Sequence, residues 1–539
     1  MSSTDTTPHT TSAWDELVFD NRFTDELPAD PIEGPALRQV TGAVYSRVRP
    51  VTVPDPRIIG WSAEVAADLG LPADYGSDPD SAAVLTGNRI LVGADPHAMN
   101  YGGHQFGNWA GQLGDGRAIA LGEVVGADGR HHTLQLKGAG PTPYSRRADG
   151  LAVLRSSVRE FLCSEAMHHL GVPTTRALSL ALTGNQVMRD MFYDGNPAPE
   201  PGAVVCRVAP SFLRFGNYQI LAARDDGELL RTLVDFTITH HFGHLGAPSP
   251  EVYGECFAEI CRTTCAMVLD WMRVGFVHGV MNTDNMSIHG LTIDYGPYGW
   301  LDDFDPDWTP NTTDANGRRY RYGYQPQIAQ WNLLQLANAL VDLVGATEPL
   351  EAALHAYATD FADGYRRMML AKLGLTADRG EEEADHALIG DLVEVLRLTE
   401  TDMTIFHRRL ADVPAETAAD DGPAIVADAY YTPDTVGKVA RTRTVEWLRA
   451  YGERCRLEER GDAERAVAMN AVNPKYVLRN YLAQQAIDAA AEGDFGEIAT
   501  LLELLRRPYD DQPDQGIYAA KRPDWARTKP GCSMLSCSS

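Results

Sequence analysis

Two Asn and two Asp residues fall within one short, turn-rich stretch of the sequence, residues 278–296. They are Asn282, Asp284, Asn285 and Asp294. Carboxylate and amide oxygens suit a hard cation such as Mg²⁺, which commonly binds the phosphates of a nucleotide. The stretch therefore predicts a metal–nucleotide site. The alternative is an ordinary polar loop, because Asn and Asp are common turn residues.

The catalytic segment of protein kinases gives a frame for these residues. It reads H-R-D-L-x-x-x-N and then D-F-G, in which the first Asp is the base and the Asn and second Asp hold metal. His278, Asn285 and Asp294 take the His, Asn and D-F-G positions. The base position falls on Val280, which cannot accept a proton, and a carboxylate stands at Asp284 instead. The metal ligands of a kinase are thus present, but the base is displaced.

Composition narrows the class of protein. The length of 539 residues is enough for two to four domains or one two-lobed unit with extensions, and a hydrophobic content of 44% supports a large core. The net charge of −27 argues against binding to nucleic acids or to anionic membranes. No apolar run is long enough to cross a membrane, and the N-terminus does not resemble a signal peptide. With only eight cysteines, we expect a cytoplasmic protein without a disulfide framework.

The sequence upstream predicts a glycine-rich lid and a lysine on a strand. Glycines are frequent in residues 101–123, and glycine lets a backbone approach a ligand closely. AIALGEV and HHTLQLK read as two strands joined by the turn GADG, and the second strand ends at Lys137. A glycine-rich turn, a hairpin and a strand lysine are the parts that cover ATP in a kinase-like small lobe.

A helix with a glutamate follows the lysine strand. Apolar residues recur at helical spacing over residues 151–171, and the helix carries Glu160. A kinase-like fold pairs such a Glu with its strand Lys, although a solvated Glu on an amphipathic helix is the alternative. Next, RVAPSFLRFG contains Arg207 and Arg214, which either clamp phosphate or edge a sheet.

These features predict an α+β chain with a two-lobed protein-kinase-like fold, N- and C-terminal extensions and a mainly helical C-terminal half. The acidic run at residues 380–385 reads as a solvated loop. Four divisions are expected. Residues 1–45 form an N-terminal extension, partly disordered, and residues 46–225 form a kinase-like N-lobe. Residues 226–430 form a helical C-lobe with the metal loop, and residues 431–539 form a helical extension with a Cys-containing tail.

Several long blocks carry a resemblance to a known family. They read YGGHQFGNWAGQLGDGR, LQLKGAGPTPYSR, ADGLAVLRSSVRE, RVAPSFLRFG and HGVMNTDNMSIHGLTIDYGPYGWLDDFDP. With these blocks the chain resembles the selenoprotein O family, a group of protein adenylyltransferases, from about Pro50 to the end. The resemblance implies a kinase-like fold that binds ATP in a flipped orientation and transfers AMP to Ser, Thr or Tyr hydroxyls of protein substrates.

The resemblance also implies roles for individual residues. Asp284 is the expected catalytic base, Asn285 and Asp294 the expected ligands of Mg²⁺ (or, alternatively, Mn²⁺), and Glu160 the partner of Lys137. The expected ATP contacts are Gly114, Gly116, Arg117, Lys137, Asp149, Gly150, Arg207, Arg214 and Asp294.

Two cysteines in the tail KPGCSMLSCSS are further candidates. Some members of the family carry selenocysteine third from the end, and that position is Cys537 here. An exposed thiol in the tail would be free to react, so Cys532 is a candidate redox partner of Cys537. The alternative is a disordered tail with two idle thiols.

Three functions therefore compete at this point. Protein adenylyl transfer is favoured, and it needs ATP, a divalent cation and protein substrates. A conventional kinase using the γ-phosphate is disfavoured by Val280. A catalytically silent pseudokinase is disfavoured because Lys137, Glu160, Asn285 and Asp294 are all present.

Overall fold

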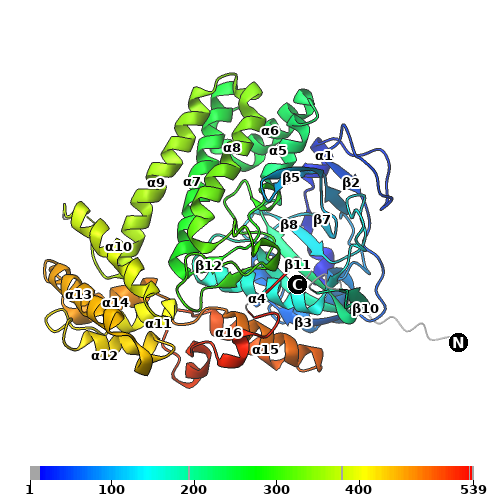
Figure 1. Ribbon diagram of the computed structural model, residues 1–539. Coiled ribbons are helices and arrows are strands. Elements are labelled where there is room, and N and C mark those ends of the chain that lie inside the picture. Colours follow the sequence, from blue (N-terminus) through cyan, green and yellow to red (C-terminus); the bar gives the residue numbers. More distant parts are fainter. Residues whose placement is uncertain (1–11, 192–194, 378–379, 533, 537–539) are drawn as a thin grey trace.

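The computed structural model describes residues 12–191, 195–377, 380–532 and 534–536. An antiparallel sheet dominates the N-terminal half, long helices stand beside it, and a smaller helical group lies to one side (Figure 1). Residues 1–11, where disorder was expected, lie outside the described residues. The prediction of an α+β chain with a mainly helical C-terminal half is confirmed. The division of the chain into four parts stays a prediction.

The main sheet has nine strands among the described residues, in the order β2-β4-β7-β8-β11-β10-β3, with β1 paired to β7 and β9 paired to β11. Two smaller sheets pair β5 with β6 and β12 with β13. The strands are β1 Val18–Phe19, β2 Tyr45–Arg47, β3 Arg57–Trp61, β4 His97–Met99, β5 Gly102–Gln105, β6 Asn108–Gln112, β7 Ala118–Val125, β8 His131–Lys137, β9 Ala152–Val153, β10 Arg176–Arg189, β11 Ala198–Ala209, β12 Phe276–Val277 and β13 Gly299–Trp300.

The helices surround this sheet and fill the C-terminal half. They are α1 Arg22–Glu26, α2 Ala63–Asp68, α3 Pro79–Leu85, α4 Leu154–His169, α5 Phe215–Ala222, α6 Gly227–His241, α7 Pro250–Val274, α8 Gln325–Val344, α9 Glu348–Lys372, α10 Glu382–Arg397, α11 Met403–Leu410, α12 Gly422–Val426, α13 Lys438–Cys455, α14 Asp462–Val472, α15 Asn480–Ala491 and α16 Gly496–Leu505.

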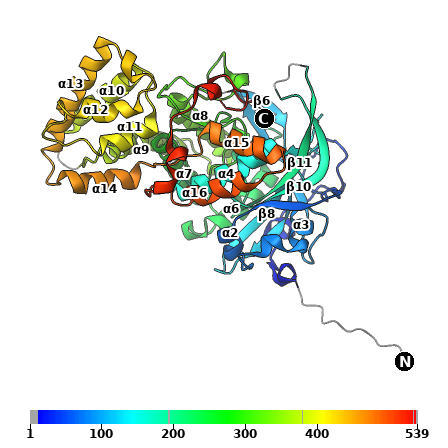
Figure 2. The ribbon, with the colours of Figure 1, turned by 90° about the horizontal axis from the view of Figure 1, so that it is seen from below.

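The predicted hairpin of β7 and β8 is present and antiparallel. Leu134 and Leu136 of β8 are buried in one hydrophobic cluster, since alternate residues of a strand share a face. Lys137 therefore points to the opposite face, where the pocket described below lies. The predicted helix after the lysine strand is α4, and α15 and α16 pack against it (Figure 2).

Helix α7 delivers the chain to the Asn- and Asp-rich stretch. Ser249 caps its start by accepting a hydrogen bond from the Val252 N–H, and Pro250 occupies the first turn. Gly275 ends the helix with a φ of 77°, a left-handed conformation that glycine adopts without steric cost. Strand β12 begins at the next residue, so the predicted site follows directly on a well-defined helix end.

Helices α10 to α14 and the end of α9 share a separate hydrophobic cluster. The acidic run predicted to be a solvated loop instead leads into α10, which begins at Glu382. Asp385 is buried there, and its Oδ1 lies 2.8 Å from Nε of Arg454 on α13. Residues 380–384 are exposed, as predicted, but the prediction of a loop was wrong from Glu382 on, and the prediction of exposure was wrong for Asp385, where a distant arginine supplies the counter-charge that burial requires.

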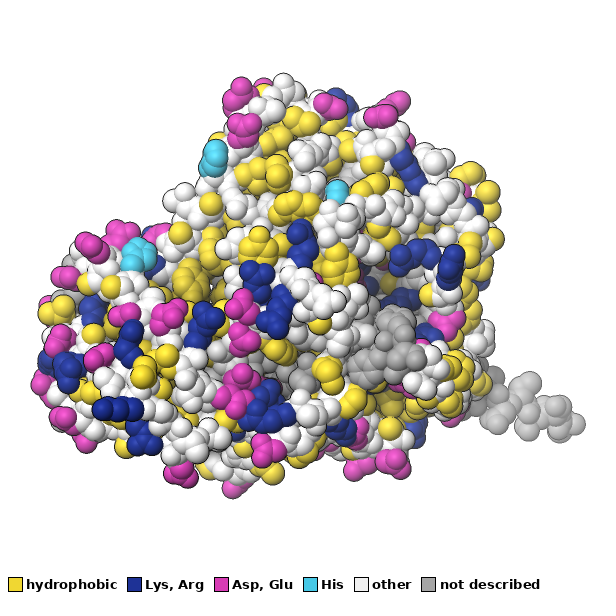
Figure 3. All heavy atoms as spheres, in the orientation of Figure 1, with side chains coloured by type: hydrophobic (Ala, Val, Ile, Leu, Met, Phe, Trp, Pro, Cys, Tyr) yellow, Lys and Arg dark blue, Asp and Glu magenta, His cyan; other side chains and the backbone are white. Residues whose placement is uncertain are grey.

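On the face shown in Figure 3, acidic and basic side chains are interspersed over the smaller helical group. Mixed charges of this kind are typical of a hydrated surface. None of the helices within the described ranges has both the length and the apolar character needed to cross a membrane.

A substitution at one glycine of α5 can test how closely this helix approaches the β5–β6 hairpin. A Cβ on Gly216 of α5 would lie 2.1 Å from the carbonyl oxygen of Gly102 on β5. We expect Gly216→Ala to lower the free energy of unfolding by about 2–3 kcal/mol, because two backbones must separate. Denaturant unfolding followed by tryptophan fluorescence measures the change.

The matched control is Gly390→Ala in α10, where a Cβ would meet nothing within 4 Å. This variant should be about 0.5–1 kcal/mol more stable than the wild type, since alanine favours the helix. Equal effects of the two substitutions would contradict the close approach of α5 to β5.

Candidate functional site

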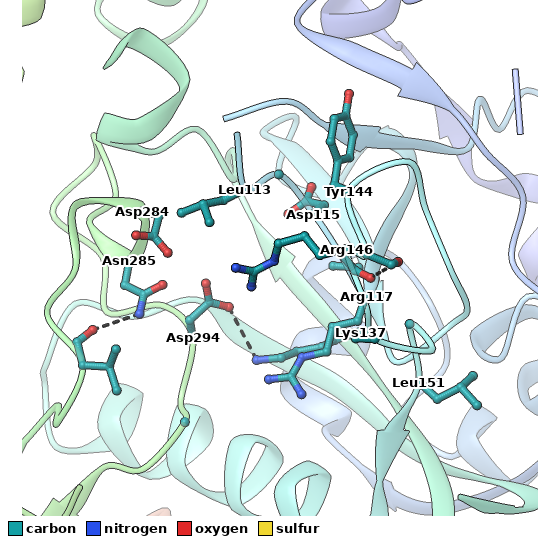
Figure 4. A pocket seen from close by; sticks show the side chains of 18 of the residues that line it. Leu113, Asp115, Arg117, Lys137, Tyr144, Arg146, Leu151, Asp284, Asn285 and Asp294 are labelled. Atoms are coloured by element: carbon teal, nitrogen blue, oxygen red, sulfur yellow. Dashed lines mark hydrogen bonds and ion pairs between the residues drawn. The ribbon is translucent and has the colours of Figure 1, made fainter. Parts of the chain in front are cut away.

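A cavity of about 690 Å³ lies between the N-terminal sheet and the Asn- and Asp-rich stretch (Figure 4). The predicted ATP, metal and base residues all line it: Gly114, Gly116, Arg117, Lys137, Asp149, Gly150, Arg207, Arg214, Asp284, Asn285 and Asp294. Glu160 lies behind Lys137 in the protein interior. The structure thus brings together residues that are far apart in the sequence.

Lys137 and Glu160 form the predicted ion pair, with 2.6 Å between Nζ and Oε2. Burial lowers the pKa of Lys137, whereas Glu160 and Asp294 raise it. Nη1 of Arg207 lies 3.2 Å from Oε1 of Glu160 and 2.6 Å from Oδ1 of Asp294. One buried glutamate therefore joins the lysine of β8 to the arginine of β11.

The carboxylate of Asp294 forms ion pairs with three cationic side chains. Nζ of Lys137 lies 3.4 Å from its Oδ1, Arg207 bonds the same oxygen, and Arg214 pairs with Oδ2. Burial alone would raise the pKa of Asp294, but Arg214, Lys137 and Arg207 hold it well below its usual range. Asp294 also has a φ of 57°, an uncommon conformation for a residue other than glycine. The three ion pairs hold this residue in its strained conformation at the meeting point of the sheet and the loop.

Arg214 is placed at the start of α5 and is buried. Its guanidinium lies over the ring of Tyr101, 4.7 Å from the centroid, and Nη2 lies 3.8 Å from Oδ1 of Asp115. Nη1 also donates to the carbonyl oxygen of Asp284, at 2.9 Å. Of the two roles open for Arg207 and Arg214, the structure places both side chains in the cavity lining, paired with Asp294.

Asp284 is buried at the wall of the cavity. Nε2 of Gln105 donates to its Oδ2 at 3.4 Å, and its Oδ1 has no hydrogen-bond partner among the described residues. Burial raises the pKa of Asp284 to about 6. A Cβ on Gly103 would lie 2.5 Å from Oδ1, so only glycine fits between β5 and this carboxylate.

The β5–β6 hairpin is bonded to the loop around Asp284. The His104 N–H donates to Oγ1 of Thr283 at 2.7 Å, and the Phe106 N–H donates to Oδ1 of Asn282 at 3.2 Å. Tyr320 donates to the same Asn282 oxygen at 2.6 Å. The glycine-rich hairpin therefore holds the loop in place as well as lining the cavity.

Asn285 and Asp294 fit a divalent cation by donor type. Nδ2 of Asn285 donates to the carbonyl oxygen of Val280 at 2.8 Å, so the amide is oriented with Oδ1 on its other side (Figure 4). Asp294 lines the cavity, and its two carboxylate oxygens are paired with the cationic side chains of Lys137, Arg207 and Arg214. Amide and carboxylate oxygens together are the donor set that Mg²⁺ takes.

The sequence did not single out four residues that shape the cavity. They are Asp115, which faces Arg214, Tyr144 and Arg146 on the loop after β8, and Arg189, which binds Asp149 with Nη1–Oδ2 at 2.7 Å. Tyr144 and Arg146 belong to the block GAGPTPYSRRADG, whose basic pair was the one available signal. Asp115 and Arg189 carry no local signal, because their partners lie elsewhere in the chain.

The tail cysteines do not join this site as far as the structure describes them. Cys532 is buried, and burial raises its pKa to about 11, so the expectation of an exposed, reactive thiol is wrong for this residue. Cys537 lies outside the described residues. A pairing of these two thiols stays a prediction.

Comparisons with known proteins cover most of the chain. A family model described as "Protein adenylyltransferase SelO" matches residues 33–506. Proteins named "Protein nucleotidyltransferase YdiU" are similar over 97% of this chain and 99% of their own length: 60% identical in Azoarcus sp. (strain BH72) and 59% identical in Rhodopirellula baltica. The corresponding protein of Xanthomonas campestris pv. campestris (strain 8004) is 56% identical over the same shares.

Among solved structures, ROP2 from Toxoplasma gondii is described as a virulence factor with a protein-kinase fold and no enzymatic activity. It is 10% identical, and the match covers 56% of this chain and 87% of that chain with a TM-score of 0.23. A likeness at this score bears neither on the fold nor on the function of this chain.

The buried glutamate gives a test of the ion network. Glu160→Gln leaves Lys137 and Arg207 with Asp294 as their shared counter-charge, so we expect the free energy of unfolding to fall by about 3–5 kcal/mol. Chemical denaturation measures this loss. Glu503→Gln, at an exposed ion pair with Arg506, should change stability by no more than about 0.5 kcal/mol. A comparable loss in both variants would argue against a central role for Glu160.

Proposed function

The chain belongs to the protein adenylyltransferase SelO family, and from this membership we propose that it transfers AMP from ATP to hydroxyl side chains of proteins. The relatives named protein nucleotidyltransferase share almost its whole length, which supports nucleotidyl transfer as the reaction. The single observation that carries the proposal within the site is Asp284. The position of the kinase base is occupied by Val280 in this chain, and the carboxylate of Asp284, later in the same stretch, lines the cavity instead.

In this proposal the cavity takes the triphosphate of ATP. Gly114, Gly116 and Gly150 allow the backbone to approach it, and Arg117, Lys137, Arg207 and Arg214 supply positive charge. Asn285 and Asp294 would hold Mg²⁺, which when bound neutralises phosphate charge. Mn²⁺ is the alternative cation, and the same oxygen donors would accept it.

Asp284 is the proposed general base. The hydroxyl oxygen of the substrate forms a bond to the α-phosphorus, its proton goes to the Asp284 carboxylate, and the bond from the α-phosphorus to the pyrophosphate oxygen breaks. A burial-raised pKa of about 6 supports this role, because a base titrating near neutral pH is still ionised and accepts protons well. The Asp284 side chain lines the cavity, and its Oδ1, which lies against Gly103 of β5, has no hydrogen-bond partner among the described residues.

A flipped nucleotide is part of the same proposal. Reversal of ATP relative to a kinase would present the α-phosphorus, not the γ-phosphorus, to the displaced base. Ser, Thr and Tyr are the proposed acceptors, and a cytoplasmic location is proposed because the cysteines of the described residues are free thiols.

Labelled ATP tests the reaction directly. With Mg²⁺ and candidate protein substrates, we expect label on protein from [α-³²P]ATP and none from [γ-³²P]ATP. Asp294→Ala should transfer neither label, since it removes a proposed metal ligand. Label from the γ-phosphate alone would establish a conventional kinase, and ATP binding without any transfer would favour a silent pseudokinase.

Asp284→Asn tests the base. The amide keeps the shape of the side chain but cannot accept the proton, so we expect the transfer rate to fall about 10²–10⁴-fold. ATP affinity, measured by calorimetry, should stay within about threefold of wild type, because ATP is held by other residues. Asp303→Asn, at a partly exposed pair with Arg522, is the control and should retain the rate. Full activity of Asp284→Asn would remove Asp284 from the mechanism.

A further inference from the structure

The loop between β8 and β9 is fixed over the glycine-rich segment. Oγ1 of Thr142 donates to the carbonyl oxygen of Asp115 at 2.7 Å, and Oγ of Ser145 donates to the carbonyl oxygen of Gly116. The Thr142 N–H donates to the same Ser145 hydroxyl at 2.8 Å. This loop therefore has a defined conformation at the mouth of the cavity.

Arg146 sits in a strained turn of this loop. The Ala148 N–H donates to the carbonyl oxygen of Ser145 at 2.8 Å, which closes a four-residue turn with Arg146 in its second position. The φ of Arg146 is 55°, and turns of this kind favour Gly, Asn or Asp there. Strained residues persist where surrounding contacts hold them, and they cluster at functional sites. Asp294, with a φ of 57°, is a second example in this cavity.

The charge of Arg146 is not neutralised by an ion pair with any described residue. Four other cations of the cavity are paired: Lys137, Arg207 and Arg214 with Asp294, and Arg189 with Asp149. Arg117 and Arg147 also line the cavity without an ion pair to a described residue, but of these unpaired arginines only Arg146 has a positive φ. Arg146 lines the same cavity and its side chain is exposed. In Figure 4 the side chain reaches from its loop into the cavity, toward the side where Asp284 and Asp294 lie.

We propose that Arg146 is a catalytic residue that contacts the phosphate oxygens of the departing pyrophosphate and neutralises the charge that develops on them in the transition state. The inference rests on the proposed AMP transfer. As the substrate oxygen bonds to the α-phosphorus and its proton passes to Asp284, the electron pair of the broken phosphorus–oxygen bond goes to pyrophosphate. An unpaired guanidinium at the cavity mouth meets this developing charge without first breaking an ion pair.

A guanidinium suits this role better than an ammonium group. Its planar fork can bind two phosphate oxygens at once, and its charge persists at any physiological pH. Arg146→Lys should therefore retain only part of the activity, because it keeps the charge but loses the two-point contact.

The turn strain makes the test selective. Arg146→Gly removes the side chain and relaxes the backbone, so the melting temperature should equal or exceed that of wild type. The kcat for transfer from [α-³²P]ATP should fall about 100-fold, as expected for loss of one transition-state donor. The Kd for MgATP should change by less than about threefold. Arg146→Asn, which also tolerates positive φ, should behave like the glycine variant.

Arg318→Gly is the matched control. Arg318 is exposed, has a φ of 46° and does not line the cavity, so its replacement relieves the same kind of strain elsewhere. It should leave kcat unchanged. If Arg146→Gly keeps the wild-type kcat, or if Arg318→Gly loses as much, the inference is refuted while the proposed function stands. Absence of α-label transfer by the wild-type protein would refute the proposed function and the inference with it.

Discussion

The need to neutralise buried charge between the sheet and the loop governs the arrangement of the site. Lys137 and Arg207 come from adjacent strands, Arg214 begins a helix, and all three converge on Asp294. Isolated charges are costly in a protein interior, so each of these groups requires the others to be in place. The network therefore fixes the loop relative to the sheet and keeps Asp294 ionised at the wall of the cavity.

The local elements of the site were readable from the sequence because they depend on local patterns. Strand β8 follows from its alternating Leu residues, and helix α4 follows from its apolar spacing. The Lys137–Glu160 pair followed from the order of the elements in a kinase-like chain. Contacts made across the fold were not readable, such as Gln105 with Asp284 and Arg189 with Asp149, because no spacing rule links their positions.

Two predictions made from the sequence, for Asp385 and for Cys532, were wrong for the same physical reason. The composition of a segment indicates how polar it is, but it does not indicate which distant residues pack against it. Asp385 was expected in a solvated loop, yet Arg454 pairs with it inside a helical cluster. Cys532 was expected on an exposed tail, yet its side chain is part of the main hydrophobic core. In both cases packing against remote parts of the chain overrode the local signal.

The packing of α15 and α16 on α4 has a consequence for how the chain is made. Helix α4 carries Glu160, but part of its apolar surface is covered only by helices near the other end of the sequence. During synthesis the nascent N-terminal half therefore emerges with that surface bare, until the last helices leave the ribosome. Exposed apolar surface in a growing chain invites aggregation and chaperone binding. The helix that carries this glutamate is thus fully covered only late in the synthesis of the chain.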